Sequence, residues 1–342
     1  MKKALYGSTA LVAAGAFGAV PAAAEEGVTV GVSGYLNTMF GVLNVDDDAQ
    51  SATVGTPRDF GNTAQITDGE VHFKGKTTLD NGITFGVQIE LESQATGDQI
   101  DENYAFVEGS FGRFVIGGEN QAAYQMHYAA PSVGQPLNSG WQTAWIPAPQ
   151  GVVDATGAVV SFATGFRRPS LSTYVDFGND EHSITYYTPR FSGFQFGASY
   201  APAVAGTGDG QNRPANKNAQ LHDMWAVGAN YVQSFDGIDV AVSGGLAGAS
   251  STNGSGADDP LVYSVGVNLG FGGFTVGGSW AQEDSDTAQN GWGASAGVSY
   301  ATGPWSVGID GFLSETDGTG ADDQNLTSAQ IGVGYQVGPG IS

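Results

Sequence analysis

The stretch EVHFKGKTTLDNGITFGVQIELE, residues 70–92, decides the fold that the sequence predicts. Apolar and polar side chains alternate along it with a period of two, which is typical of a β-strand whose two faces differ. Asn81 and Gly82 interrupt the alternation, and this dipeptide is a strong signal for a two-residue hairpin turn because both central positions require positive φ. One face of the predicted hairpin is apolar, and the other carries Glu70, His72, Lys74, Lys76, Gln88, Glu90 and Glu92.

The same alternation recurs on both sides of this hairpin, between short turns that are rich in glycine. We expect a first strand within residues 27–45, a polar loop from Asp46 to about Thr67, and a last strand over residues 326–337. Further hairpins are predicted around turns at residues 111–112, 191–193, 236–237, 272–273 and 302–304. The total is about fourteen strands of roughly nine to twelve residues, the length at which a tilted strand crosses a membrane.

Two kinds of connection alternate between these strands. One kind is about two to four residues long, and the other is long and acidic, as is typical of outer-membrane barrels. Aromatic residues gather at strand ends, where interfacial girdles lie in such barrels. The pattern predicts an all-β fold, a transmembrane antiparallel β-barrel. A soluble β-sandwich is the alternative, but a chain of this length would then need several domains with linkers, and the sequence contains no such linker.

The composition excludes some functions. Of the 342 residues only 13% are charged, whereas soluble domains average about 25%. The formal net charge of -23 excludes phosphate-backbone binding as a main task, so we expect no nucleic-acid partner. The absence of cysteine removes disulfide and thiolate chemistry.

The N-terminus predicts export. Lys2 and Lys3 precede an apolar run over residues 4–20, and a row of alanines ends at Ala24, before Glu25. This order is typical of a signal peptide, here residues 1–24. A membrane anchor would need about 20 apolar residues, and Pro21 argues against one.

Residues 120–180 break the pattern of alternation. They are rich in Pro, Gly, Ala and aromatic residues, with scattered polar groups. Loops longer than about 12–15 residues are uncommon and are usually functional or disordered, and the apolar clusters here argue against disorder. We therefore expect the flanking strands to build a wall and this stretch to fold inside it.

Two segments carry a family resemblance. NYAFVEGSFGRFVIGGEN, residues 103–120, and HSITYYTPRFSGFQFGASYAP, residues 182–202, resemble the strands just before and just after the constriction loop of Gram-negative general (non-specific) outer-membrane porins of the alphaproteobacterial type. The resemblance covers essentially the whole mature chain. It implies a 16-stranded homotrimeric barrel in the outer membrane, whose third extracellular loop, here about residues 120–180, folds inward.

The chain departs from this family at its C-terminus. Family members normally finish with a strand that ends in Phe, whereas this sequence finishes Gly340, Ile341, Ser342. A barrel must close, because an open edge in lipid leaves backbone groups unpaired. We therefore expect residues 25–342 to be a C-terminally incomplete barrel with about 14 of the 16 strands, and a natural 14-stranded barrel is the alternative.

Charged residues on the polar faces are the candidates for a pore constriction, where opposed charges set ion selectivity. In the first hairpin, Lys74 and Lys76 should lie beside Glu90 and Glu92. The alternative is that all the candidates are ordinary wall residues that face water. The full set of candidates is Lys74, Lys76, Glu90, Glu92, Arg113, Glu119, Asp154, Arg167 and Arg168.

No catalytic set can be placed in a shared cleft, so we expect no enzyme. The four histidines have no metal-ligand spacing, and no cofactor is expected, although the Asp-rich loops could bind Ca²⁺. The function predicted is passive diffusion of ions and small hydrophilic solutes, weakly cation-selective, among outer-membrane lipids and lipopolysaccharide. The alternatives are a substrate-specific outer-membrane channel, a barrel-anchored surface or adhesion protein, and a soluble calcium-binding β protein.

Overall fold

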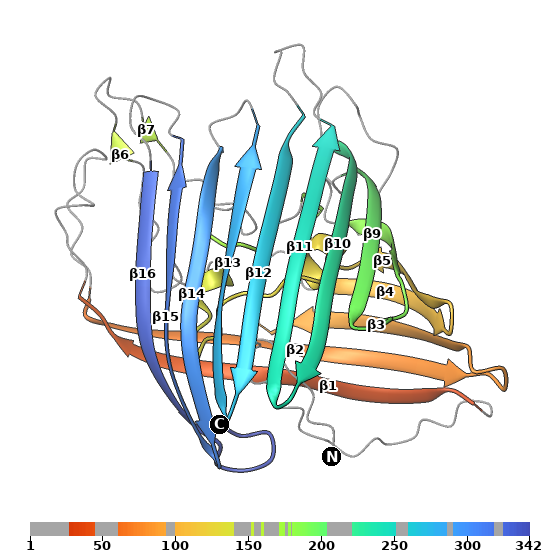
Figure 1. The fold of residues 1–342 in the computed structure, drawn as a ribbon, viewed down its shortest axis with the longest axis horizontal. Helices are drawn as coiled ribbons and strands as arrows, with labels where there is room; N and C mark the ends of the chain where they lie inside the picture. The colour runs from red at the N-terminus through yellow and green to blue at the C-terminus, as the bar shows by residue number, and fades with distance from the viewer. Residues whose placement is uncertain are drawn as a thin grey trace.

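The fold is one large antiparallel sheet, described here from a computed structural model (Figure 1). The structure describes residues 27–44, 61–93, 100–139, 152–153, 159–160, 171–174, 177–178, 180–203, 221–250, 259–285, 290–317 and 324–342. The predicted signal peptide, residues 1–24, lies outside these ranges.

Fourteen strands form the sheet, each hydrogen-bonded to its neighbours in chain order. The strands are β1 (Thr29–Val42), β2 (Thr63–Thr78), β3 (Thr84–Glu92), β4 (Ile100–Gly109), β5 (Gly112–Gly118), β8 (His182–Tyr187), β9 (Phe194–Ala203), β10 (His222–Phe235), β11 (Ile238–Ser250), β12 (Leu261–Phe271), β13 (Phe274–Asp284), β14 (Gly291–Thr302), β15 (Trp305–Thr316) and β16 (Gln324–Tyr335). A separate pair, β6 (Val152–Val153) and β7 (Val159–Val160), lies outside the sheet. The number of strands predicted from the sequence is confirmed.

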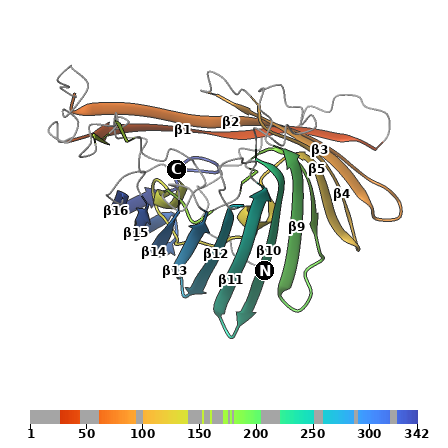
Figure 2. The same ribbon diagram turned by 90° about the horizontal axis from the view of Figure 1, so that it is seen from above.

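The sheet curves into a wall. Seen from above, β1 and β2 form one side and β9 to β16 form the other (Figure 2). Within the described residues, β1 pairs only with β2 and β16 only with β15, so these two strands are the edges of the wall. The predicted alternation of short and long connections is confirmed, since β10–β11, β12–β13 and β14–β15 turn tightly at one end.

Two local predictions were wrong. The polar loop expected through about Thr67 ends earlier, because β2 begins at Thr63, opposite Val42. The Asn81-Gly82 turn contains three residues rather than two, because the Leu79 amide donates to the Ile83 carbonyl at 2.9 Å. Only Gly82 has positive φ there, at 80°, as a type I turn followed by a left-handed residue requires.

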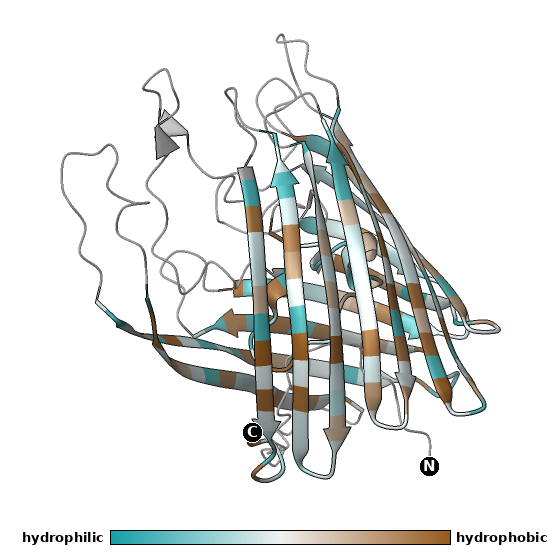
Figure 3. Cartoon of the chain, turned by 60° about the vertical axis from the view of Figure 1, so that its left-hand side comes forward, coloured by the Kyte–Doolittle hydropathy of each residue, from teal (hydrophilic) through white to brown (hydrophobic). Residues whose placement is uncertain are grey.

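The outer face of the wall is apolar. Large hydrophobic side chains at every second position of a strand are exposed, including Val30 and Leu36 on β1 and Val265 and Val267 on β12. Coloured by hydropathy, the strands are banded rather than uniformly polar (Figure 3). An exposed apolar face of this extent is unusual for a soluble monomer and marks a surface for membrane or protein contact.

None of the helices in the described part of the chain is long and apolar enough to cross a membrane.

Aromatic rings form groups in contact at the end with the short turns. Phe191 lies in the β8–β9 turn and Phe194 begins β9. The centre of the Phe194 ring lies 4.7 Å from the centre of the Tyr231 ring on β10. Further pairs are Phe114–Tyr186, Phe271–Phe274, Phe274–Tyr300 and Trp305–Tyr335. These rings lie where an interfacial girdle is expected.

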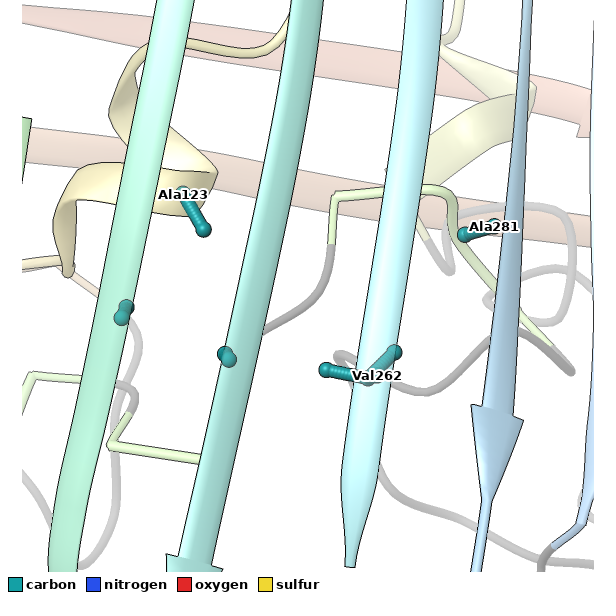
Figure 4. Close-up of a cluster of buried hydrophobic side chains, with 5 residues drawn as sticks. Ala123, Val262 and Ala281 are labelled. Carbon is teal, nitrogen blue, oxygen red and sulfur yellow. The ribbon is translucent and has the colours of Figure 1, made fainter. Parts of the chain in front are cut away.

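The core lies between the wall and a segment inside it. This segment contains the short helix α1 (Ala122–Gln125) and the 3-10 turn η2 (Leu137–Ser139). Ala123 of α1 packs with Val262 of β12 and Ala281 of β13 in a buried cluster (Figure 4). The prediction of a stretch folded inside the wall is confirmed for residues 120–139, and much of residues 140–180 lies outside the described part.

Candidate functional site

Residues 119–139, here called the inner segment, lie across the inner face of the wall. Their backbone is held by serine hydroxyls from successive strands. The Ala122 amide donates to Ser199 Oγ on β9 at 2.8 Å, and the Tyr128 amide donates to Ser243 Oγ on β11 at 2.9 Å. Further along, the Ala130 amide donates to Ser295 Oγ on β14 at 3.3 Å. The segment therefore crosses the wall from β9 towards β16.

Glycines let the inner segment lie directly on the strands. A Cβ added at Gly266 on β12 would stand 1.6 Å from the Tyr128 carbonyl oxygen. A Cβ added at Gly332 on β16 would stand 1.5 Å from the Val133 carbonyl oxygen. Both distances are far below van der Waals contact, so only glycine fits at these two positions.

A network of buried hydrogen bonds joins the inner segment to residues 171–174. The side-chain Nδ2 of Asn138 donates to Thr173 Oγ1 at 2.6 Å, and the Thr173 backbone amide donates to Asn138 Oδ1 at 2.7 Å. Thr173 Oγ1 also bonds Ser279 Oγ of β13 at 2.6 Å and His127 Nε2 at 3.1 Å. Burial without a charged partner lowers the pKa of His127 to about 3, so this imidazole is neutral at pH 7.

The inner segment starts at a buried acidic group. Glu119 accepts hydrogen bonds from the Asn120 amide at 3.0 Å and from Gln125 Nε2 at 2.6 Å. Asn120 Nδ2 also donates to Glu102 Oε1 on β4 at 2.7 Å. Burial raises the pKa of Glu119, and hydrogen bonds with Glu102, Tyr104 and the Asn120 backbone amide partly oppose the rise. Asn120 thus ties the start of the segment to the wall.

The inner face of β2 and β3 carries the charged residues of the first hairpin. The register places Glu90 opposite His72 and Glu92 opposite Glu70. Lys74 lies opposite Gln88 and Lys76 opposite Gly86, so neither lysine is the direct partner of a glutamate. Lys74 lies diagonally from Glu90, two residues along β2 from the direct partner His72, and Lys76 lies further along the same face. The three-residue turn fixes this register.

The other candidates are spread along the chain. Arg113 on β5 lies opposite Glu108, with its guanidinium carbon 4.5 Å from the centre of the Phe106 ring. Glu119 lies at the start of the inner segment. Asp154, Arg167 and Arg168 lie outside the described residues. The structure thus brings Lys74, Lys76, Glu90 and Glu92 onto one hairpin face, whereas Arg113 and Glu119 lie elsewhere.

The candidate set for the constriction left out Glu70 and His72, although the sequence places both on this polar face. His72 Nε2 lies 2.6 Å from Glu70 Oε2 and 3.1 Å from Glu90 Oε2. Tyr35 of β1 joins them, because its hydroxyl donates a hydrogen bond to Glu70 Oε1 at 3.0 Å. The alternation of Glu70 and His72 on the polar face was a readable signal, but their partners required the correct register.

The wall is antiparallel, apolar on its outer face and polar on its inner face, and it has a segment folded inside it. These features define the class: a channel protein that crosses the membrane with β-strands. The family model of the Gram-negative porins matches residues 7–342, and the chain belongs to that family. It is therefore an outer-membrane porin, and membership of this family points to a channel rather than an enzyme.

Solved structures of low identity share the fold. OmpT, an outer membrane protein of Vibrio cholerae, in a trimer form, is 13% identical with a TM-score of 0.58, over 92% of this chain and 85% of that chain. OmpF of Salmonella typhi in complex with daunomycin is 16% identical with a TM-score of 0.57, over 91% and 87%. A mutant of the Rh. blastica porin is 18% identical with a TM-score of 0.51, over 91% of each chain. No curated protein matches the chain.

Proposed function

We propose that the protein is a non-specific, weakly cation-selective porin through which ions and small hydrophilic solutes diffuse passively. The observation that carries the proposal is the excess of carboxylates on the inner face of the first strands. Lys74 and Lys76 are outnumbered on β2 to β4 by Asp68, Glu70, Glu90, Glu92 and Asp101. Close charges on a pore wall attract counter-ions and so favour cations.

The assembly proposed is a homotrimer, exported by the signal peptide and surrounded by lipid and lipopolysaccharide. Support comes from the trimer form of the similar Vibrio cholerae protein and from the apolar outer face. Asp259, Asp284 and Asp317 lie at or beside the strand ends that lead into the long connections. We infer that these acidic connections attract divalent ions such as Ca²⁺ at the pore mouth.

A substrate-specific channel would need a ladder of aromatic rings along the lumen. In the described part of the chain, the ring contacts of the inner segment are those of Tyr124 and His127 with Tyr174. The remaining ring pairs lie mainly at the end of the wall with the short turns. This distribution favours a non-specific pore.

Insertion into planar lipid bilayers tests the proposal. In a gradient of KCl the reversal potential should have the sign of a cation-selective pore, and conductance should be ohmic for a range of small salts. An anion-selective reversal potential would overturn the proposed selectivity. Saturable conduction of one solute class would overturn the proposed lack of specificity.

A further inference from the structure

We propose that Glu70, His72 and Glu90 form a binding site for a divalent transition metal ion, with Zn²⁺ as the probe, on the inner face of β2 and β3. The two strands are adjacent in the wall (Figure 1). Passive diffusion does not require this site, so the inference stands apart from the proposed function.

The geometry of the three side chains suits a metal ion. His72 Nε2, Glu70 Oε2 and Glu90 Oε2 all lie within 4.8 Å of one another. One imidazole nitrogen and two carboxylate oxygens form a donor set that Zn²⁺ uses, with bonds of about 2.0–2.2 Å. Ligand atoms around a tetrahedral ion then lie roughly 3.4 Å apart. The observed distances of 2.6 and 3.1 Å from the imidazole nitrogen need only small side-chain rotations to reach that spacing.

Neighbouring side chains orient both carboxylates. The Tyr35 hydroxyl donates to Glu70 Oε1 at 3.0 Å, and Gln88 Nε2 donates to Glu90 Oε1. In each carboxylate the other oxygen, Oε2, is therefore the one directed at His72. Partners of this kind hold metal ligands in place and are worth about 10–100-fold in affinity. The wall thus supplies three ligands together with the groups that position two of them.

Backbone pairing fixes the three ligands relative to one another. Glu70 and His72 are two residues apart on the same face of β2, and Glu90 is the direct cross-strand partner of His72. Ligands on paired strands keep their spacing better than ligands on loops. The His72 side chain is 14% exposed and Glu90 is 9% exposed, so the site is shielded but still reachable from solvent.

Charge and donor type select the ion. Two carboxylates balance the charge of a divalent cation. His72 adds a nitrogen donor, which favours Zn²⁺ and similar metals, since Ca²⁺ and Mg²⁺ prefer oxygen ligands only. A second group, Glu70, Glu92 and Asp101, offers three carboxylate oxygens within the same spacing and is the place where Ca²⁺ would compete through the shared Glu70.

The test is a titration of the full chain, folded in detergent micelles, with Zn²⁺ by calorimetry and with Co²⁺ by visible absorption. We expect one Zn²⁺ to bind per chain, and we expect the visible absorption spectrum of bound Co²⁺ to be typical of an ion with a low coordination number. His72→Gln should weaken Zn²⁺ binding by more than about 100-fold, and Tyr35→Phe by about 10–100-fold, since it removes only an orienting partner. His222→Gln is the matched control, because among the described residues that histidine forms an ion-pair contact with one carboxylate, Asp223, at 2.8 Å. It should leave Zn²⁺ binding unchanged.

Several results would overturn the site. They are absence of Zn²⁺ binding in the unaltered chain, unchanged affinity in His72→Gln, or Ca²⁺ binding as tightly as Zn²⁺ and insensitive to His72. If His72→Gln does not fold by circular dichroism, Glu90→Gln and Tyr35→Phe carry the same test. Conductance measured on the same preparations separates the two proposals. Normal cation-selective channels that bind no Zn²⁺ would overturn the metal site and leave the proposed function intact.

Discussion

Gly266 is a residue at which one added methyl group collides with the inner segment. An alanine Cβ at this position would stand 1.6 Å from the Tyr128 carbonyl oxygen, which belongs to the backbone, so a rotamer change cannot relieve the clash. Overpacking of this kind costs about 1–3 kcal/mol. Gly266→Ala should therefore lower the midpoint of thermal unfolding. Gly244→Ala on the adjacent β11, where the nearest atom is 3.9 Å away, is the control and should leave the midpoint close to its original value.

His127 makes the anchorage of the inner segment sensitive to acid. Its folded-state pKa of about 3 lies below the ordinary value of 6.5. The unfolded chain therefore takes up the proton first, and stability present above pH 6.5 is lost as the pH falls towards 3. Between pH 6.5 and 4.5 the loss is about 2–3 kcal/mol.

Hydrogen exchange of residues 121–139 at pH 7.5 and 4.5 measures this effect. The raised pKa of Glu119 acts in the opposite sense, because a carboxyl that is easier to protonate when folded gains stability as the pH falls. The comparison with His127→Gln removes the histidine contribution and keeps that of Glu119. The variant should lose less protection on acidification than the unaltered chain. Equal losses in both would show that His127 does not carry the effect.

At the scale of the elements, local pattern predicted the strands and could not predict their register. The period of two is a property of neighbouring residues, so the fourteen strands were readable from the sequence. The partner of Glu90 depended on whether the turn before Ile83 held two residues or three. The path of the inner segment depended on contacts between residues more than a hundred positions apart, such as Tyr128 with Ser243. The small residues Ser264, Gly266 and Gly332 were a signal for that path, since a wall face without large side chains leaves room for a second layer.

The inner segment, as an element, should limit the width of the pore. It lies against β9 to β16 through backbone and serine contacts, and the wall strands pair with one another without it. Shortening the stretch 120–180 should therefore raise single-channel conductance while the sheet content measured by circular dichroism stays the same. An equal deletion in the β9–β10 connection, residues 204–220, is the control and should leave conductance unchanged. Unaltered conductance after the first deletion would place the stretch outside the ion path.

At the scale of the whole molecule, two charge distributions act on a permeating ion. The chain has 34 Asp and Glu against 11 Lys and Arg, and many of the acids fall in the long connections at one end. A field of this kind acts over a distance of about 30 Å at 0.01 M salt and about 3 Å at 1 M. The Glu70–His72–Glu90 group and the two lysines act on the wall itself, at distances that salt screens less.

These ranges predict how selectivity depends on salt. Cation selectivity should be strongest at low ionic strength, where the acidic mouth concentrates cations, and should fade as salt rises and only the wall charges remain effective. Lys74→Ala together with Lys76→Ala should strengthen cation selectivity at every salt concentration, because both side chains are exposed on the carboxylate-rich face of the hairpin. Reversal potentials across tenfold KCl gradients, repeated at several mean concentrations, measure both effects. Asp236→Asn is the control for a single change of charge. Asp236 lies at the short β10–β11 turn, at the end of the wall opposite the acidic connections, so the reversal potential should shift little. A cation preference that stays constant with salt concentration would show that the wall charges alone set the selectivity. An unchanged reversal potential in the Lys74→Ala, Lys76→Ala variant would show that the hairpin does not lie on the ion path.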